Sequence, residues 1–323
     1  MAKVRSADTL TSDMLAGDRV ALARLITRVE SRGPDTAAIM SRIYGHCGRA
    51  FTIGITGPPG AGKSTISNCL IEHLRAQGKS VGVVAIDPSS PFSGGAVLGD
   101  RIRMQKHFLD PDVFIRSLST RGSHGGLARS GRDVTRLFDA FGKDVVILET
   151  VGVGQTELDI MEVADTVVVV LVPESGDTIQ VMKAGLLEIA DVFVVNKADR
   201  EGAARMRTEL QTMLHLQVDE NGAGWEVPVL MTTASAGKGT EEVLTTCLDH
   251  QNYLDDPARA DRRGERLKSE VLDICQELLM GRLRSTAGDG PTARILDEVA
   301  AGKRDPYQAA LDILKDSDPA ASS

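Results

Sequence analysis

The sequence is poor in the residues from which disulfide and zinc sites are built. Its 323 residues include four cysteines and six histidines, all scattered, with no C-x-x-C pair and no paired histidines at zinc-ligand spacing. We therefore interpret the cysteines as reduced thiols in the protein core rather than as redox or metal groups. They are Cys47, Cys69, Cys247 and Cys275.

The sequence also lacks a basic excess and long apolar runs. A net charge of −8 argues against a general nucleic-acid binder. The longest apolar runs, 166–172 and 192–195, fall far short of the roughly 20 residues that span a bilayer, so no membrane partner is expected. The first residues show neither an apolar signal region nor an Arg-rich transit pattern, so the sequence predicts a cytoplasmic location.

Periodicity divides the chain into four parts. Residues 1–48 are predicted to be an N-terminal helical segment, 49–250 an α/β domain, 251–317 a helical C-terminal region and 318–323 a disordered tail. In the second part, short β-branched runs alternate with amphipathic helices, which is typical of a mostly parallel central sheet covered on both faces. The expected strands are 51–56, 80–86, 113–118, 144–148, 166–172, 192–195 and 227–231.

One motif follows the first strand directly and precedes a helix predicted to begin near Thr65. It fits G-x-x-x-x-G-K-[ST], the loop of P-loop NTPases. Glycines let backbone N–H groups approach phosphates, Lys63 reaches the β- and γ-phosphates, and Ser64 offers a hydroxyl to Mg²⁺. The predicted phosphate-binding residues are Gly57, Pro58, Pro59, Gly60, Ala61, Gly62, Lys63, Ser64 and Thr65.

Two carboxylates follow strands at the edge where open α/β sheets bind ligands. Asp87 follows the second strand and Glu149 the fourth, which makes both candidates for holding the metal. After Glu149, the N–H of Gly152 is placed to approach a γ-phosphate, and Gln155 lies in the same segment, so both are candidate catalytic residues. The alternative for either carboxylate is a helix-capping role.

A second motif, N-K-x-D, follows the strand at 192–195 and comprises Asn196, Lys197, Ala198 and Asp199. A carboxylate such as Asp199 accepts hydrogen bonds from guanine N1–H and the 2-amino group, and adenine offers neither donor. Sites of this kind discriminate by roughly 10⁴–10⁵, so GTP and GDP are favoured over ATP. Beyond the next strand, a backbone N–H in Thr233, Ala234 and Ser235 is placed to meet guanine O6.

Together these strings resemble the MeaB/ArgK/MMAA GTPases, and the likeness extends over most of the chain. It rests on the P-loop G-P-P-G-A-G-K-S and on N-K-A-D, with three strings between them. These are D-P-S-S-P from Asp87, G-D-R-I-R-M from Gly99 and E-T-V-G-V-G-Q from Glu149.

The resemblance implies a homodimeric GTPase that assists a cobalamin-dependent acyl-CoA mutase, gating cofactor loading and protecting or rescuing the mutase. It implies that Mg²⁺ is surrounded by Ser64, Asp87, Asp100 and Glu149, and that Lys63 and Arg103 act in catalysis. Arg103 would neutralise transition-state charge, although it and Arg101 can also be read as solvated helix charges. Segments 120–126 and 174–183 resemble mobile elements of the family.

Two other functions fit parts of the pattern. The first is a metallochaperone GTPase, but such proteins usually carry His-rich or paired-Cys tracts, and this sequence has neither. The second is an ATP-dependent small-molecule kinase, which conflicts with the guanine specificity that N-K-x-D predicts. In the C-terminal region, apolar residues recur at three- and four-residue steps, from Leu267 to Leu279 and again near Ile295 and Ile313. Such stripes predict a covered face, either in a homodimer, as the resemblance implies, or against the chain's own GTPase domain.

Overall fold

The computed structural model describes residues 5–87, 104–119, 126–150, 160–173, 185–217, 224–255, 261–286 and 290–316. The chain divides into two compact units, Met1–Asp255 and Asp256–Ser323. Within the described ranges, no helix is long and apolar enough to cross a membrane. The tail at 318–323 lies outside these ranges.

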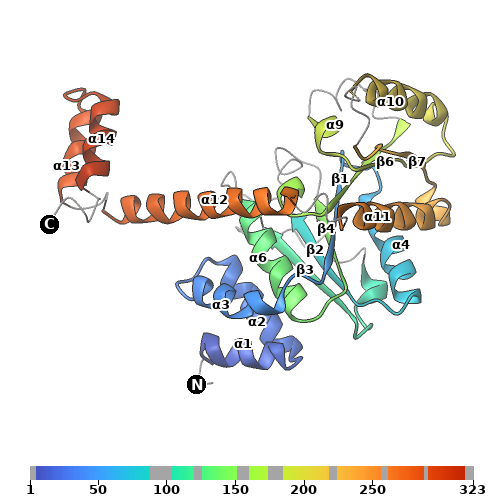
Figure 1. Ribbon diagram of the computed structural model, residues 1–323, viewed down its shortest axis with the longest axis horizontal. Coiled ribbons are helices and arrows are strands. Elements are labelled where there is room, and N and C mark those ends of the chain that lie inside the picture. Colours follow the sequence, from blue (N-terminus) through green and yellow to red (C-terminus); the bar gives the residue numbers. More distant parts are fainter. Residues whose placement is uncertain are drawn as a thin grey trace. The chain divides into compact units, whose positions relative to one another are not determined.

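The first unit is built on a seven-stranded sheet in the order β3-β2-β4-β1-β5-β6-β7, with every pairing parallel (Figure 1). Each predicted strand is present, and bounds differ by at most two residues. Four of the strands are buried at every position, as strands covered on both faces require. The strands are β1 Phe51–Thr56, β2 Val81–Asp87, β3 Val113–Ser119, β4 Val145–Thr150, β5 Thr166–Leu171, β6 Val192–Val195 and β7 Val229–Met231.

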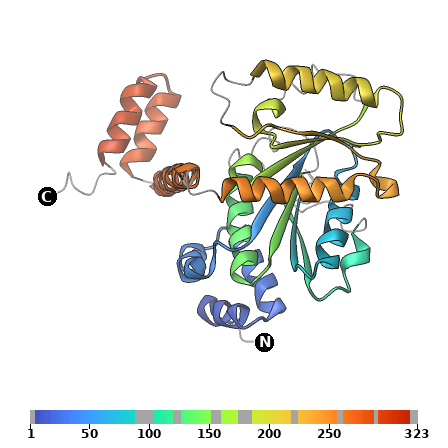
Figure 2. The ribbon, with the colours of Figure 1, turned by 45° about the vertical axis from the view of Figure 1, so that its right-hand side comes forward.

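Helices cover both faces of this sheet (Figure 2). Each face therefore has its own apolar core. Helices α4 (Lys63–Ala76) and α11 (Thr240–Leu254) pack on one face, and α6 (Gly126–Ala140) and α10 (Ala203–Gln217) pack on the other. The predicted P-loop NTPase architecture with a mostly parallel sheet is confirmed. Short elements complete the unit: η1 Tyr44–His46, η2 Gln105–His107, η3 Ile160–Glu162, α9 Leu186–Ile189 and η5 Ala234–Ala236.

The N-terminal segment forms three helices, α1 (Ala7–Leu15), α2 (Arg19–Glu30) and α3 (Thr36–Ile43). Their apolar faces continue the core on the α6 side, where Leu22, Leu25, Ile26 and Val29 of α2 are buried. The carboxylate of Asp139 accepts the backbone N–H groups of Arg49 at 3.1 Å and Ala50 at 2.9 Å. The chain is thereby anchored to α6 just before it enters β1.

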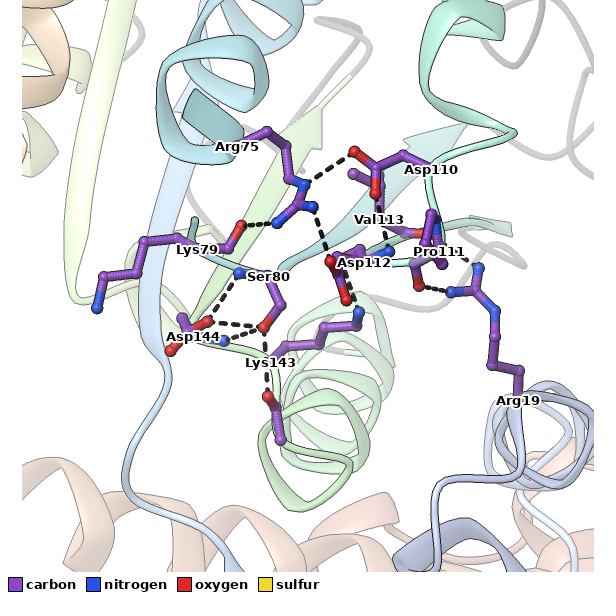
Figure 3. A network of polar contacts seen from close by, with 11 residues as sticks. Arg19, Arg75, Lys79, Ser80, Asp110, Pro111, Asp112, Val113, Lys143 and Asp144 are labelled. Atoms are coloured by element: carbon purple, nitrogen blue, oxygen red, sulfur yellow. Dashed lines mark hydrogen bonds and ion pairs between the residues drawn. The ribbon is translucent and has the colours of Figure 1, made fainter. Parts of the chain in front are cut away.

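Where β2, β3 and β4 begin, three cations hold the turn before β3 (Figure 3). Arg75 bonds Asp110 at 2.8 Å and Asp112 at 2.7 Å. Arg19 donates to the carbonyls of Pro111 and Val113, and Lys143 donates to the Asp112 carbonyl at 2.7 Å. Burial lowers the pKa of Lys143 to about 8, and nearby Arg19 adds to this shift. This cluster lies at the amino ends of the strands, the sheet edge opposite the predicted site.

The second unit contains α12 (Asp261–Thr286), α13 (Pro291–Ala300) and α14 (Pro306–Asp316). Helices α13 and α14 pack on each other, and the guanidinium of Arg304 between them pairs with Glu298 at 3.1 Å and with Asp312. Helix α13 begins at Pro291 directly after Gly290, and proline is favoured at the first position of a helix. Within the single chain, Val271, Leu278 and Leu279 of α12 are exposed by more than half.

The cysteines differ in their surroundings. All four are free, and Cys247 is buried while Cys47 and Cys69 are half-buried. Burial raises the pKa of the Cys47 thiol to about 11, which leaves little thiolate near neutral pH. Cys275 is exposed on α12, so its assignment to the core is wrong for the single chain.

Candidate functional site

The loop Gly57–Ser64 joins β1 to α4 at the carboxyl edge of the sheet, and two of its glycines are required there. Gly57 has φ +133°, and an added Cβ would lie 2.1 Å from the carbonyl oxygen of Val170. Gly62 has φ +90°, and an added Cβ would lie 2.4 Å from the Nδ2 of Asn196. Neither position accepts a side chain without displacing its neighbour. The loop therefore packs closely against β5 and against the N-K-x-D motif.

Helix α4 begins at Lys63, two residues before the predicted start, so Lys63 and Ser64 belong to its first turn. Lys63 is 6% exposed, and its Nζ donates to the carbonyls of Gly57 at 2.7 Å and Pro58 at 3.0 Å. Its positive charge is thus held inside the loop, next to the positive dipole end of the helix. This combination suits the binding of anionic phosphates.

The carboxylate of Glu149 lies beneath the same turn. Glu149 is part of β4 rather than following it, which corrects the predicted end of this strand. Its Oε1 accepts a hydrogen bond from Ser64 Oγ at 2.5 Å, and its Oε2 accepts one from Ser67 Oγ at 2.7 Å. Because the Ser64 hydroxyl donates its hydrogen bond to Glu149, the lone pairs of Ser64 Oγ remain available to bind a cation.

Asn196 connects the N-K-x-D motif to two neighbouring loops. Its Nδ2 donates to the Ala61 carbonyl at 2.8 Å, and its Oδ1 accepts from Thr232 Oγ1 at 3.0 Å and from Ala234 N at 3.1 Å. Asn196 is 3% exposed, so these bonds are shielded from water. One side chain therefore fixes the P-loop, the end of β6 and the segment after β7 relative to one another.

The rest of the predicted base site lies at the same edge. Asp199 and Ser235 are exposed, while Lys197 and Thr233 are half-buried. Lys197 has φ +55°, a left-handed conformation that non-glycine residues rarely adopt. The main chain of Thr233 is held by Lys238, whose carbonyl accepts its N–H at 3.1 Å. In the P-loop and the first turn of α4, the exposed residues are Pro59, Gly60 and Thr65.

Several predicted site residues are only partly described or lie outside the described ranges. Asp87 is the last residue of β2 and pairs in register with Ser119, and its side chain is not described. The predicted residues outside the described ranges are Asp100, Arg101, Arg103, Gly152 and Gln155, as are residues 120–125 and 174–183.

Two residues at the site were missed by the sequence reasoning. Ser67 binds Glu149, and its position three residues after Ser64 on a helix was a usable signal, because such residues share a face. Thr232 binds Asn196, and it adjoins the predicted segment 233–235 without any motif of its own.

A phosphate-binding loop and an N-K-x-D loop, joined by hydrogen bonds at the carboxyl edge of an all-parallel sheet, define a P-loop GTPase. Comparison with known proteins agrees with this class. Residues 22–288 match the family described as methylmalonyl Co-A mutase-associated GTPase MeaB.

Individual relatives extend over nearly the whole chain. A protein of Pyrococcus abyssi whose name describes it as a GTPase is 48% identical over 96% of this chain and 96% of its own. The mouse mitochondrial methylmalonic aciduria type A homolog is 32% identical over 96% of this chain and 79% of its own. A crystal structure titled LAO/AO transport system kinase has 26% identity and a TM-score of 0.69, covering 97% of this chain and 99% of that one.

The chain belongs to the MeaB family of GTPases. It is accordingly a GTP-hydrolysing enzyme that binds guanine nucleotide. The resemblance stated from its motifs is thereby confirmed.

Proposed function

We propose that this GTPase is a chaperone for a cobalamin-dependent acyl-CoA mutase, timing adenosylcobalamin loading and protecting or reactivating the mutase. The observation that carries the proposal is the family match over residues 22–288, whose description associates these GTPases with methylmalonyl-CoA mutase. The relative named for methylmalonic aciduria supports the same kind of client.

The proposed nucleotide site follows from the bonds around the P-loop. The backbone N–H groups from Gly60 to Ser64 and the ammonium of Lys63 are assigned to the β- and γ-phosphates, and the enclosure of Lys63 at the first turn of α4 supports this assignment. Thr65, exposed in the same turn, lies at the rim of this cradle. Binding in this way neutralises phosphate charge before hydrolysis begins.

For the base, we assign selection of guanine to the Asp199 carboxylate and contact with O6 to the N–H of Ser235. Ala234 is a poorer candidate for O6 because its N–H already donates to Asn196. Lys197 and Thr233 complete the walls of the base site. Asn196 links these residues to the P-loop, so the phosphate-binding and base-binding loops are fixed relative to each other.

The residues present also fit Mg²⁺. Within the described ranges no group of three or more His, Cys, Asp or Glu could hold a metal by itself. Mg²⁺, however, usually takes only one or two protein ligands and completes its shell with water and nucleotide phosphates. Ser64 and Glu149 supply such donors, and we propose Asp87 and Asp100 as their partners. Bound there, Mg²⁺ would neutralise charge on the β- and γ-phosphate oxygens.

Catalytic roles are proposed for residues beyond β4 and before η2. We assign the N–H of Gly152 to the γ-phosphate, and Gln155, in the same segment, a catalytic role beside it. Arg103 is assigned to stabilising the charge that develops on the transferring phosphoryl group. Phosphoryl transfer depends mainly on positioning and electrostatic stabilisation, so a cation in this place contributes about 10³–10⁵ in rate.

We further propose that region 251–317 forms a homodimer contact. Helix α12 carries an apolar stripe that the single chain leaves exposed, with exposed fractions of 58% for Val271, 56% for Leu278 and 55% for Leu279. Exposed apolar faces of this kind mark interaction surfaces.

The client is tested by reconstitution. Purified chain is mixed with adenosylcobalamin-dependent mutases that act on methylmalonyl-, isobutyryl-, 2-hydroxyisobutyryl- or ethylmalonyl-CoA, and complex formation is followed by light scattering with GDP and with a non-hydrolysable GTP analogue. We expect one mutase to bind and its cofactor loading to depend on the nucleotide. If no mutase binds, and no mutase co-purifies with the affinity-tagged protein from the native cell, the chaperone role is wrong. The assignment as a GTPase is unaffected by that result.

A further inference from the structure

Two serines on one face of α4 share a single buried carboxylate. Ser64 Oγ donates to Oε1 of Glu149 and Ser67 Oγ donates to Oε2, at 2.5 and 2.7 Å. All three side chains are almost inaccessible to solvent, with exposed fractions of 7% for Ser64, 0% for Ser67 and 3% for Glu149. Each carboxylate oxygen thus has its own hydroxyl donor.

The backbones on both sides of this arrangement are fixed. Glu149 pairs with Ile55 of β1 and with Ala85 of β2, so its main chain is held from both neighbouring strands. Ser67 lies one turn beyond Ser64 in α4 and projects from the same face. With both ends fixed and both oxygens bonded, the plane of the Glu149 carboxylate is set by the two serines together.

The two serines differ in their surroundings. Ser64 lies at the P-loop and is part of the proposed metal site. Ser67 is one turn deeper, fully buried, and its described hydrogen bond is the one to Glu149. Among the described residues Ser67 is thus linked to the proposed metal site by its bond to Glu149, and we expect its influence on metal or nucleotide to pass through that carboxylate.

We infer that Ser67 is a positioning residue, which orients Glu149 and thereby sets the Mg²⁺ affinity of the nucleotide complex. The inference rests on the proposed metal site at Ser64 and Glu149. Without the Ser67 hydroxyl, Oε2 loses a donor, and one restraint on rotation of the carboxylate about its terminal torsion is removed. Residues that orient metal-binding groups in this way typically change metal affinity by about 10–100-fold when removed.

The test measures release of a fluorescent GDP derivative from the full-length chain across a range of Mg²⁺ concentrations. For Ser67→Ala we expect the half-saturating Mg²⁺ concentration to rise about tenfold. GDP affinity measured in EDTA should stay within about twofold of the wild type, because the phosphate loop and the base loop are untouched. Thr11→Ala is the matched control, since it removes another buried hydroxyl, on α1, with no expected change in Mg²⁺ dependence.

Two further variants separate positioning from a general packing effect. In a Glu149→Gln background, adding Ser67→Ala should change Mg²⁺ dependence by less than about twofold, because the group through which Ser67 acts is already altered. Ser67→Thr, which keeps the hydroxyl, should restore most of the Mg²⁺ affinity. Ser67→Cys, a weaker donor of similar size, should give an intermediate value and serves if the alanine variant does not fold.

The outcomes distinguish this inference from the proposal on which it rests. If wild-type GDP release does not depend on Mg²⁺, the metal site itself is wrong and the inference is overturned with it. If the wild type depends on Mg²⁺ and Ser67→Ala behaves identically, only the role of Ser67 is overturned. The role of Ser67 would also be overturned if Ser67→Ala changed the Mg²⁺ dependence of GDP release equally in the wild-type and Glu149→Gln backgrounds.

Discussion

The side-chain amide of Asn196 donates to the main-chain carbonyl of Ala61 across 2.8 Å, which ties the N-K-x-D loop to the P-loop although 135 residues separate them. The close approach explains why Gly62 has no side chain, since a Cβ there would lie 2.4 Å from Asn196 Nδ2. Two motifs that are written separately in the sequence form one rigid element in the fold.

This relationship predicts the effect of Asn196→Ala. The change removes three buried hydrogen bonds and leaves the Ala61 carbonyl and Ala234 N–H without this partner, at a cost of about 2 kcal/mol in the free energy of unfolding. GTP affinity should fall at least about tenfold, because phosphate and base loops are no longer held together. Calorimetry and chemical denaturation measure both quantities. Asn252→Ala, exposed on α11, is the control, and an equal loss there would contradict the prediction.

Base selection is predicted to depend on Asp199. Replacing its carboxylate by the amide of Asp199→Asn removes an acceptor for the guanine 2-amino group, so GTP binding should weaken. Binding of xanthosine triphosphate should improve relative to GTP, since its 2-oxygen accepts what the new amide donates. Titration calorimetry with both nucleotides is the measurement. An unchanged GTP affinity would remove Asp199 from the base site.

Two variants are predicted to affect nucleotide affinity and the rate of GTP hydrolysis differently. Lys63→Ala should lose nucleotide affinity, because Lys63 is enclosed in the phosphate loop. Arg103→Ala should keep affinity and lose about 10³-fold or more in hydrolysis rate, as expected for a cation that acts mainly in the transition state. Single-turnover kinetics measures the rate, and Arg101→Ala is the comparison. Normal hydrolysis by Arg103→Ala would make Arg103 a surface charge.

The buried Lys143 is predicted to make the free energy of unfolding increase with pH over a limited range. Its pKa is about 8 in the folded chain against an ordinary 10.5, so between these values the unfolded state binds more protons. The free energy of unfolding contributed by Lys143 therefore rises as the pH increases from about 8 to about 10.5 and is constant below that range. Denaturation of the wild type against Lys143→Met at several pH values measures the difference. A difference between the two proteins that does not rise over this pH range would contradict the prediction.

The helical region after Asp255 is predicted to hold a homodimer together. A chain ending at Asp255 keeps α11 whole, including the buried His250 and Cys247, and should be a monomer in light scattering. It should still bind GTP through its intact P-loop. In the full-length chain, Val271→Glu places a charge in the exposed apolar stripe and should also weaken the dimer. A truncated chain that remains dimeric would locate the interface elsewhere.

The sequence determined the class of fold because its signals are local. Runs of β-branched residues predicted all seven strands, and glycines and a lysine at fixed spacing predicted the P-loop. The position of Glu149 at the ligand edge followed from its place near the end of a strand. Each of these depends on neighbours a few residues away in the chain.

Tertiary structure decided which of these residues meet. Ser67 became a partner of Glu149, and Asn196 became the joint between three loops, because strand order and helix packing brought together residues 82 and 135 positions apart. Likewise, Cys275 looked like a core thiol by composition but lies exposed on α12. Hydrogen bonds and burial depend on distances in space, and only the packed sheet and its helices fix those distances.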